Sequence, residues 1–302
     1  MKFKMPSMAR KPLTLERKIR RAGFLFLLPW LFGIITFFVI PFINTIIWSF
    51  QDVNFATRQN AFIGGSNYHT AILRNRYFLR SLWESTSGMF IELAIILVFS
   101  FFIALVLNQK FRGRTIARAL FFVPVIVATS IVIQIIREDI FTQRLVGAAE
   151  DAAIFQTAAI ERLLFDIGLP RGLGEMIGSA LSDIFDLTWR TGMQIILFLS
   201  GLQAIPESHY EVASIEGANA WDSFWKITAP MVTPSIMLVV VYTIIDTFTD
   251  PRNPVMRVIL SEITDHLDWG VASAMAIVLF LVVGAIVGLV MLLSKRFVFY
   301  NE

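Results

Sequence analysis

The sequence predicts an all-α protein that crosses a membrane six times, mainly because of its composition and one long uncharged segment. Of its 302 residues, 56% are hydrophobic and only 16% are charged, with a mean hydropathy of +0.68. Soluble domains average about 45–50% apolar and about 25% charged residues, so this composition excludes a disordered chain and an ordinary soluble enzyme. Residues 22–50 contain no charged side chain, and this stretch exceeds the roughly 20 residues that span a hydrocarbon core.

Six apolar stretches are long enough to form spanning helices. The first, residues 22–50, lacks a small-residue cleavage site near its end and is expected to be a retained anchor, with Pro29 and Pro41 bending it. The others are residues 85–109, which only Glu92 interrupts, 119–136, about 184–206, which carries Asp186 and Arg190, 227–245 and 269–294. Residues 22–294 therefore form one transmembrane domain, between an N-terminal segment, 1–21, and a tail, 295–302.

The basic residues predict that both termini lie in the cytoplasm. Residues 1–21 contain eight lysines and arginines against one acid, and segments rich in these residues stay on the cytoplasmic side. An even number of spans then returns the chain to that side. The connection 137–183 carries eight acids against four bases and is expected to be a long outer loop. The net charge of +3 is too small to indicate nucleic acid, so the basic N-terminus is interpreted as a topological signal that contacts lipid.

The chain lacks the residue patterns of common enzymes. It has no cysteine, and its three histidines are isolated, so no zinc ligand set is expected. No Gly-Lys dipeptide occurs, which excludes a phosphate-binding loop of the Walker A type. Neither a GxSxG nor a GxGxxG pattern is present. We therefore expect no catalytic residue, no metal and no cofactor in this chain.

The connection between the fourth and fifth predicted spans is the most informative loop. Pro206 and Glu207 in a first turn and Gly217 beyond the end predict a short helix. A second helical stretch, 218–228, follows before Pro230 opens the fifth span. On the first helix Glu211, Ser214 and Ile215 share one face, and Ala213 is small enough to permit close approach. Such a face is suited to a partner's groove, although a helix that only anchors the loop to lipid explains the periodicity equally well.

The same loop resembles a known motif. Glu211-Val-Ala213, Glu216-Gly217-Ala218 and Pro230 have the spacing of the EAA loop in permease subunits of binding-protein-dependent ABC importers, in the carbohydrate-uptake branch related to the maltose permease. The similarity extends over nearly the whole chain, through Trp48-Ser49-Phe50, Asn67-Tyr68, Asn108 to Gly113, Phe121 to Pro124, Gly201 to Pro206 and Gly270 to Ala274. Residues 137–183 match poorly, so no role is carried over to them. Val212, Glu216 and Ala229 depart conservatively from the usual alanine, aspartate and leucine.

The resemblance implies a type I ABC importer permease fold in a bacterial plasma membrane. Residues 206–217 would be the coupling helix, in which Glu211 pairs with a donor on an ATPase subunit, Ala213 permits close contact and Gly217 makes the bend. Ser214, Ile215 and Glu216 belong to the same docking segment. The implied partners are a second homologous permease, two ATPase subunits that bind ATP and Mg, an extracellular solute-binding protein, and a sugar or oligosaccharide.

Polar residues inside the predicted spans are candidates for the translocation path, because such residues normally face a cavity or a partner. They are Asn44, Glu92, Gln134, Gln194 and Asp246. In the alternative interpretation, Glu92 pairs with another helix, and Gln134, Arg190 and Asp246 lie at the interface. The alternative function is an ion-coupled secondary transporter, which usually shows an inverted repeat. We find no such repeat in the sequence.

Overall fold

The computed structural model describes residues 15–54, 59–127 and 170–294, and helices dominate this part of the chain. The predicted site residue Gln134, most of the loop 137–183 and the tail 295–302 lie outside the described residues. In chain order the α-helices are α1 (Leu15–Ile34), α2 (Ile40–Trp48), α3 (Ser66–His69), α4 (Arg76–Asn108), α5 (Arg114–Val127), α9 (Arg171–Arg190), α10 (Gly192–Gln203), α11 (Glu207–Ile215), α12 (Ala220–Ser223), α13 (Ala229–Thr249), α14 (Pro254–Thr264) and α15 (Trp269–Ser294). The π-helical turns are η1 (Ile35–Val39), η2 (Thr70–Arg74) and η5 (Phe224–Thr228), and the strands are β1 (Gln51–Asn54) and β2 (Gln59–Phe62).

Four helical segments of the described residues are long and apolar enough to cross a membrane. They are Gly23–Trp48, Arg76–Asn108, Ala220–Thr264 and Trp269–Ser294, and they correspond to the first, second, fifth and sixth predicted spans. The protein is therefore an integral membrane protein. The third predicted span is described only as far as the end of α5, so the number six stays a prediction.

The boundary of the fourth predicted span was wrong. We expected one span over about 184–206 after a loop, but α9 already begins at Arg171 and ends at Arg190, and α10 starts at Gly192. The break falls at Thr191, whose backbone leaves the helical region at φ −94° and ψ 7°. The early part of α9 carries acidic residues, so hydropathy did not identify it as part of this helix.

The chain divides into two compact units, which are described separately. The first comprises residues 1–82 and 257–281. In it β1 and β2 form an antiparallel hairpin with Gln51 opposite Phe62. The buried Asn67 side chain holds the base of this hairpin, because its Nδ2 donates to the carbonyls of Ser49 (3.1 Å) and Gln51 (2.8 Å). Gly270 at the start of α15 packs here, since a Cβ would lie 2.5 Å from the Gln51 oxygen.

A π-helical turn, η1, directly precedes Pro41 in the first span. Proline has no backbone N–H to donate inside a helix, and Pro41 lies in the first turn of α2. Just before it, the N–H of Ile40 donates to the carbonyl of Ile35, which is the wider spacing of a π-turn. The proline therefore coincides with a local change in the hydrogen-bonding pattern of the first span.

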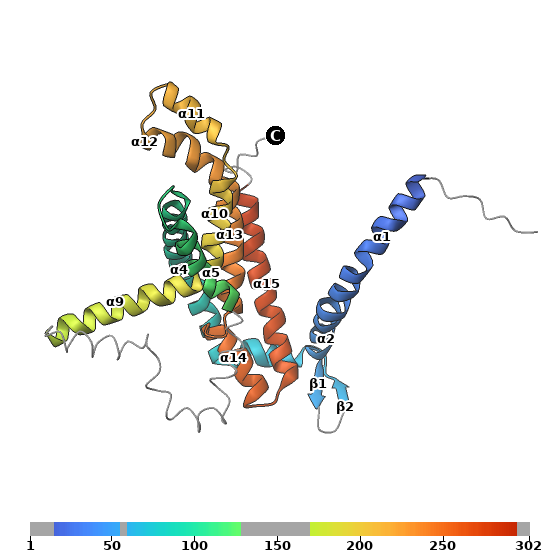
Figure 1. The fold of residues 1–302 in the computed structure, drawn as a ribbon. Coiled ribbons are helices and arrows are strands. Elements are labelled where there is room, and N and C mark those ends of the chain that lie inside the picture. Colours follow the sequence, from blue (N-terminus) through green and yellow to red (C-terminus); the bar gives the residue numbers. More distant parts are fainter. Residues whose placement is uncertain (1–14, 55–58, 128–169, 295–302) are drawn as a thin grey trace, which may run out of the picture. The chain divides into compact units, whose positions relative to one another are not determined.

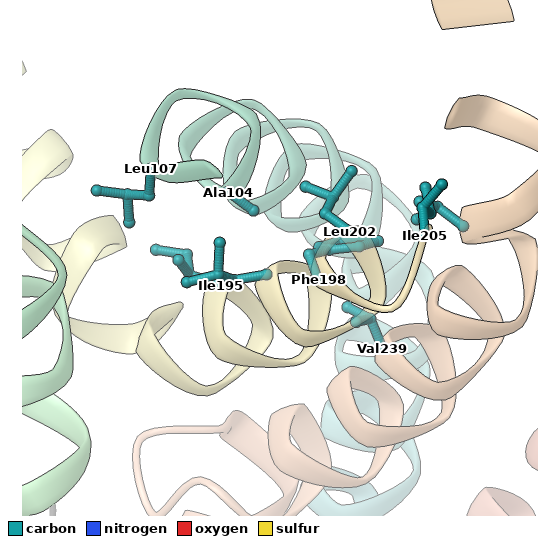
Figure 2. Close-up of a cluster of buried hydrophobic side chains, with 9 residues drawn as sticks. Ala104, Leu107, Ile195, Phe198, Leu202, Ile205 and Val239 are labelled. Atoms are coloured by element: carbon teal, nitrogen blue, oxygen red, sulfur yellow. The ribbon is translucent and has the colours of Figure 1, made fainter. Parts of the chain in front are cut away.

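The second unit, residues 83–256 and 282–302, has its core where α4, α10 and α13 pack together. Ala104 and Leu107 of α4 meet Ile195 and Phe198 of α10, as Figure 2 shows. The helices α10 and α13 approach closely at Gly201, where a Cβ would lie 2.6 Å from the Cβ of Ser235. Small residues permit such close approach of helices in membranes. These three helices therefore form the frame that carries the loop between α10 and α13.

Candidate functional site

The connection between α10 and α13 folds into two short helices, α11 and α12, which lie at one end of these two helices (Figure 1). The predicted helix over 206–217 is confirmed as α11. Gly217 has a φ of +82°, a conformation that glycine adopts without steric cost. The N–H of Ala218 donates to the carbonyl of Ala213 (2.9 Å), and Asn219 caps α12 by accepting from the N–H of Asp222 (2.8 Å). The bend between the helices is therefore fixed by backbone geometry and hydrogen bonds.

Side-chain contacts attach α11 to the rest of the second unit. The hydroxyl groups of Tyr210 and Thr228 lie 2.9 Å apart, which ties α11 to η5 at the start of the α13 segment. At the first turn of α11, Lys110 Nζ donates to Glu207 Oε1 (2.6 Å). The hydrogen bond and the charge of Lys110 lower the pKa of Glu207 below its ordinary value. This pair is exposed, so solvent screens it and its contribution to stability is small.

The exposed surface of α11 and of its C-cap residue combines polar with apolar side chains. Glu211, Ser214 and Glu216 are exposed, and Ile215 is 87% exposed. Ala213 differs from its neighbours because it is only 9% exposed. The small side chain that the sequence assigned to contact with a partner therefore points into the loop. Its small size suits this packing within the loop.

A cluster of charged side chains lies near the other end of α13. Arg190 Nη2 donates a hydrogen bond to Glu92 Oε1, and the same nitrogen lies 3.7 Å from Asp250 Oδ2. Arg252 donates to both carboxylate oxygens of Asp250, from Nε to Oδ1 (3.1 Å) and from Nη2 to Oδ2 (3.0 Å). Together with Thr247 and Asn253, these residues line a cavity of about 250 Å³. Hydroxyl, amide, carboxylate and guanidinium groups thus converge on one small space.

A second set of polar contacts supports the cavity. The buried Asn253 donates from Nδ2 to the Thr247 carbonyl (2.9 Å) and accepts at Oδ1 from the hydroxyl of Ser85 (2.6 Å). It therefore connects α4 with the end of α13. Gln194 of α10 is fully buried and lies 3.5 Å from the Thr243 hydroxyl through Nε2. Its Oε1 has no hydrogen-bond partner among the described residues.

The structure brings some of the predicted path residues together. Glu92 is part of the charged cluster, and Asp246 lies one helical turn before Asp250 on the α13 segment. Gln194 faces α13 through Thr243. Asn44 lies in α2 of the first unit. Two members of the cluster, Glu92 and Arg190, stand out in the sequence as charges inside predicted spans. Asp250 and Arg252 were missed, although these charges closely follow the fifth predicted span.

The loop and the cluster occupy opposite ends of one helix. The helix α13 has 21 residues, which at about 1.5 Å per residue gives a length of about 30 Å. This is the thickness of the hydrocarbon core of a bilayer, about 30 Å. No group of three or more metal-binding side chains of the His, Cys, Asp or Glu type occurs within the described ranges.

The fold is similar to that of an ABC importer permease. A crystal structure of a bacterial ABC transporter involved in import of the acidic polysaccharide alginate aligns with a TM-score of 0.63 at 19% identity, over 94% of this chain and 99% of that one. A second structure, of the bacterial alginate ABC transporter in complex with an alginate-bound periplasmic protein, aligns with a TM-score of 0.64 at 18% identity. These identities are low, so the similarity concerns the fold alone.

Curated relatives define the family. The chain is 31% identical to the arabinooligosaccharides transport system permease protein AraP of Bacillus subtilis, over 76% of this chain and 69% of that protein. It is 29% identical to the probable ABC transporter permease protein YesP of Bacillus subtilis, over 95% and 94% of the two chains. The multiple sugar-binding transport system permease protein MsmF of Streptococcus mutans is 28% identical over 91% of this chain and 96% of its own length. No family model matches the chain. The protein belongs to the permease proteins of ABC transporters.

Proposed function

We propose that this chain is one of two transmembrane subunits of an ATP-driven importer for a sugar or oligosaccharide in a bacterial plasma membrane. It would form half of the translocation path, with six spans and both termini in the cytoplasm. A second homologous permease, two ATPase subunits and an extracellular solute-binding protein would complete the transporter. Relatives named for multiple sugars, arabinooligosaccharides and trehalose/maltose support the substrate class. ATP and Mg would be bound by the ATPase subunits, so this chain itself would not be catalytic.

The observation that carries the proposal is the attachment of α11 to the helices that reach the charged cluster. Tyr210 ties α11 to Thr228, and α10 and α13 share a buried core with α4. A push on α11 would therefore move α10 and α13 as one body. Alternating access requires only that ATP shift the equilibrium between two packed arrangements of the helices. This assembly could transmit such a shift from α11 to α10 and α13.

Individual roles follow from the placement of each side chain on the loop. Glu211, Ser214, Ile215 and Glu216 would form the face that contacts the ATPase, since all four are exposed. In our proposal Gly217 makes the bend that returns the chain to the membrane. We revise the role of Ala213: its small side chain would let α11 pack against its own loop, and the neighbouring exposed residues would make the contact.

The path for the sugar would pass the cavity between Glu92, Arg190 and Asp250. Carboxylate, amide and hydroxyl groups of the kind found there can hydrogen-bond sugar hydroxyls. Gln194 and Asp246 would extend this polar surface along α10 and α13, and Asn44 and Gln134 stay candidates for other parts of the path. Polar groups at such depth normally face a cavity or a partner, which supports this assignment.

The decisive experiment is the charge reversal Glu211→Lys in the reconstituted transporter. We expect ATP hydrolysis stimulated by the loaded binding protein to fall about tenfold or more, as when one partner of a buried charge pair is lost. His209→Lys is the control, because it places the same lysine side chain on α11 about 160° around the helix from Glu211. Unchanged stimulation in Glu211→Lys would refute the coupling role. Uptake driven by a proton gradient without ATP would instead support the ion-coupled carrier.

A further inference from the structure

A firmly held basic turn, residues 109–114, joins α4 to α5 within the second unit. Arg118 of α5 reaches back to the end of α4, where its Nε (3.0 Å) and Nη2 (2.8 Å) donate to the carbonyl of Leu107. The end of a helix leaves such a carbonyl without a partner in the helix. Gly113 has a φ of +91° and accepts from the N–H of Ala117 (3.0 Å), which begins α5. The basic turn is therefore a fixed structural element.

The basic turn presents cations that no acid of its own segment balances. Lys110, Arg112 and Arg114 are all exposed, and residues 93–127 contain no acidic side chain. Lys110 Nζ pairs with Glu207 of α11 (2.6 Å). Among the residues that the structure describes, no carboxylate forms an ion pair with Arg112 or Arg114. Two guanidinium groups are therefore held on a fixed turn with their charges unneutralised.

The neighbouring apolar helices place the basic turn at the membrane surface. The candidate span that contains α4 ends at Asn108, and α5 begins at Arg114, so only residues 109–113 lie between the two helices. The headgroup layer is about 5–7 Å thick on each side of the hydrocarbon core, and a turn this short stays within it. Beside the cations, Phe111 is 40% and Ile116 is 68% exposed. The arginines therefore lie at the depth of the lipid headgroups.

The combination of charge, apolar surface and depth favours lipid over a protein partner. Anionic headgroups attract basic residues next to a span, and guanidinium groups form strong hydrogen bonds to phosphate. Phe111 and Ile116 would contact the acyl chains below. A bilayer supplies both partners at the depth of the basic turn, whereas an acidic protein surface would first have to displace the headgroups.

We propose that Arg112 and Arg114 form a binding site for the phosphate group of an anionic phospholipid in the cytoplasmic leaflet. The inference rests on the proposed function for the side of the membrane, because the pair of Lys110 with Glu207 places the basic turn at the same end as α11. This ion pair would also connect the site to α11. Anionic lipid would hold the basic turn at the surface and, through Lys110, the first turn of α11.

The test measures which lipid lies next to the basic turn. The chain has no cysteine, so Ile116→Cys introduces a single thiol for a bimane fluorophore in the full chain, reconstituted in nanodiscs. Phosphatidylglycerol and phosphatidylcholine that carry the same nitroxide high on one acyl chain compete to quench it. We expect phosphatidylglycerol to quench preferentially. Each basic residue near an anionic surface contributes about fivefold to binding, so Arg112→Gln/Arg114→Gln should lower this preference about fivefold or more. Arg112→Lys/Arg114→Lys should retain most of it, because the charge is kept.

The matched control is Arg74→Gln/Arg76→Gln, which removes two exposed arginines near the start of α4. It should leave the lipid preference at position 116 unchanged. An unchanged preference in Arg112→Gln/Arg114→Gln, or an equal loss in the control, would overturn the lipid site.

The complete transporter separates lipid from a protein partner. In nanodiscs with phosphatidylglycerol, Arg112→Gln/Arg114→Gln should lower the ATP hydrolysis that the binding protein stimulates, and in pure phosphatidylcholine it should equal the wild type. An equal loss in both lipids would show that the arginines contact a protein subunit, and the inference would be wrong. The quenching measurement needs neither ATPase nor binding protein. A wild-type complex that no binding protein stimulates would therefore overturn the proposed function and leave the lipid site to be judged by quenching.

Discussion

Replacing Gly201 with alanine should force α10 and α13 apart where they approach closely. A Cβ at this position would lie 2.6 Å from the Cβ of Ser235 and nearer still to its hydroxyl oxygen. Carbon atoms in good contact are about 3.5–4.0 Å apart, so the two backbones would have to separate by about 1 Å. The Ser235 hydroxyl can rotate away, but its Cβ moves only with the helix.

The size of the effect follows from two opposing contributions. Alanine is favoured over glycine inside a helix by about 0.8–1.0 kcal/mol, whereas overpacking a close contact costs about 1–3 kcal/mol. The net change is a loss of stability of about 0–2 kcal/mol. Gly88→Ala in α4 is the matched control, because nothing lies within 4 Å of a Cβ there. That variant should be as stable as the wild type or slightly more stable.

The assay measures the free energy of unfolding of the purified subunit in mixed micelles, as the fraction of a denaturing detergent is increased. It compares Gly201→Ala, Ser235→Gly and the double variant with the wild type. Removing the Ser235 side chain should relieve the clash with the added methyl group. The double-mutant cycle should therefore give a favourable coupling energy of about 1–3 kcal/mol. Coupled ATP hydrolysis should fall in Gly201→Ala and recover in the double variant. A Gly201→Ala protein as stable as Gly88→Ala, with no coupling to Ser235, would refute the close approach of these helices.

Two further predictions concern the charged cluster and the hairpin. Because Arg190 bonds to Glu92, Glu92→Gln and Arg190→Gln should each lower the free energy of unfolding by about 1–3 kcal/mol in the same assay. The double variant should lose less than the sum of the two single losses. Strictly additive losses would contradict the pair. Gly270→Ala should destabilise the hairpin base by about 1–3 kcal/mol, because its Cβ would meet the Gln51 oxygen and Asn67. The measure is faster proteolysis within β1 and β2, and unchanged cleavage would show that this packing is absent.

Much of the fold could be predicted because lipid imposes a simple rule on spanning helices. A stretch without charge that is about 20 residues long has few alternatives in a membrane, and four of the predicted spans correspond to long helices in the structure. The helix α9 did not follow this rule, because it combines apolar with acidic residues. Its start at Arg171 and its break at Thr191 depend on local backbone geometry that hydropathy does not record.

The loop shows the same division between local and tertiary information. Pro206 and Gly217 are local signals, and they predicted the helix between them nearly to its ends. The burial of Ala213 depends on how α11 packs against its own loop, which the helical periodicity of the sequence does not record. The ion pair between Glu92 and Arg190 joins residues far apart in the sequence. The charge of each residue alone did not indicate which residue would be its partner.

The contact between α11 and the ATPase is the central claim, and cross-linking tests it directly. The chain has no cysteine, so Ser214→Cys introduces a single thiol that can carry a photoreactive benzophenone. In the assembled, ATP-hydrolysing complex, we predict a covalent product between this position and the ATPase subunit. The same reagent on His209→Cys, on the other side of α11, should give little of it. A fully active complex in which position 214 never cross-links to the ATPase would contradict the account.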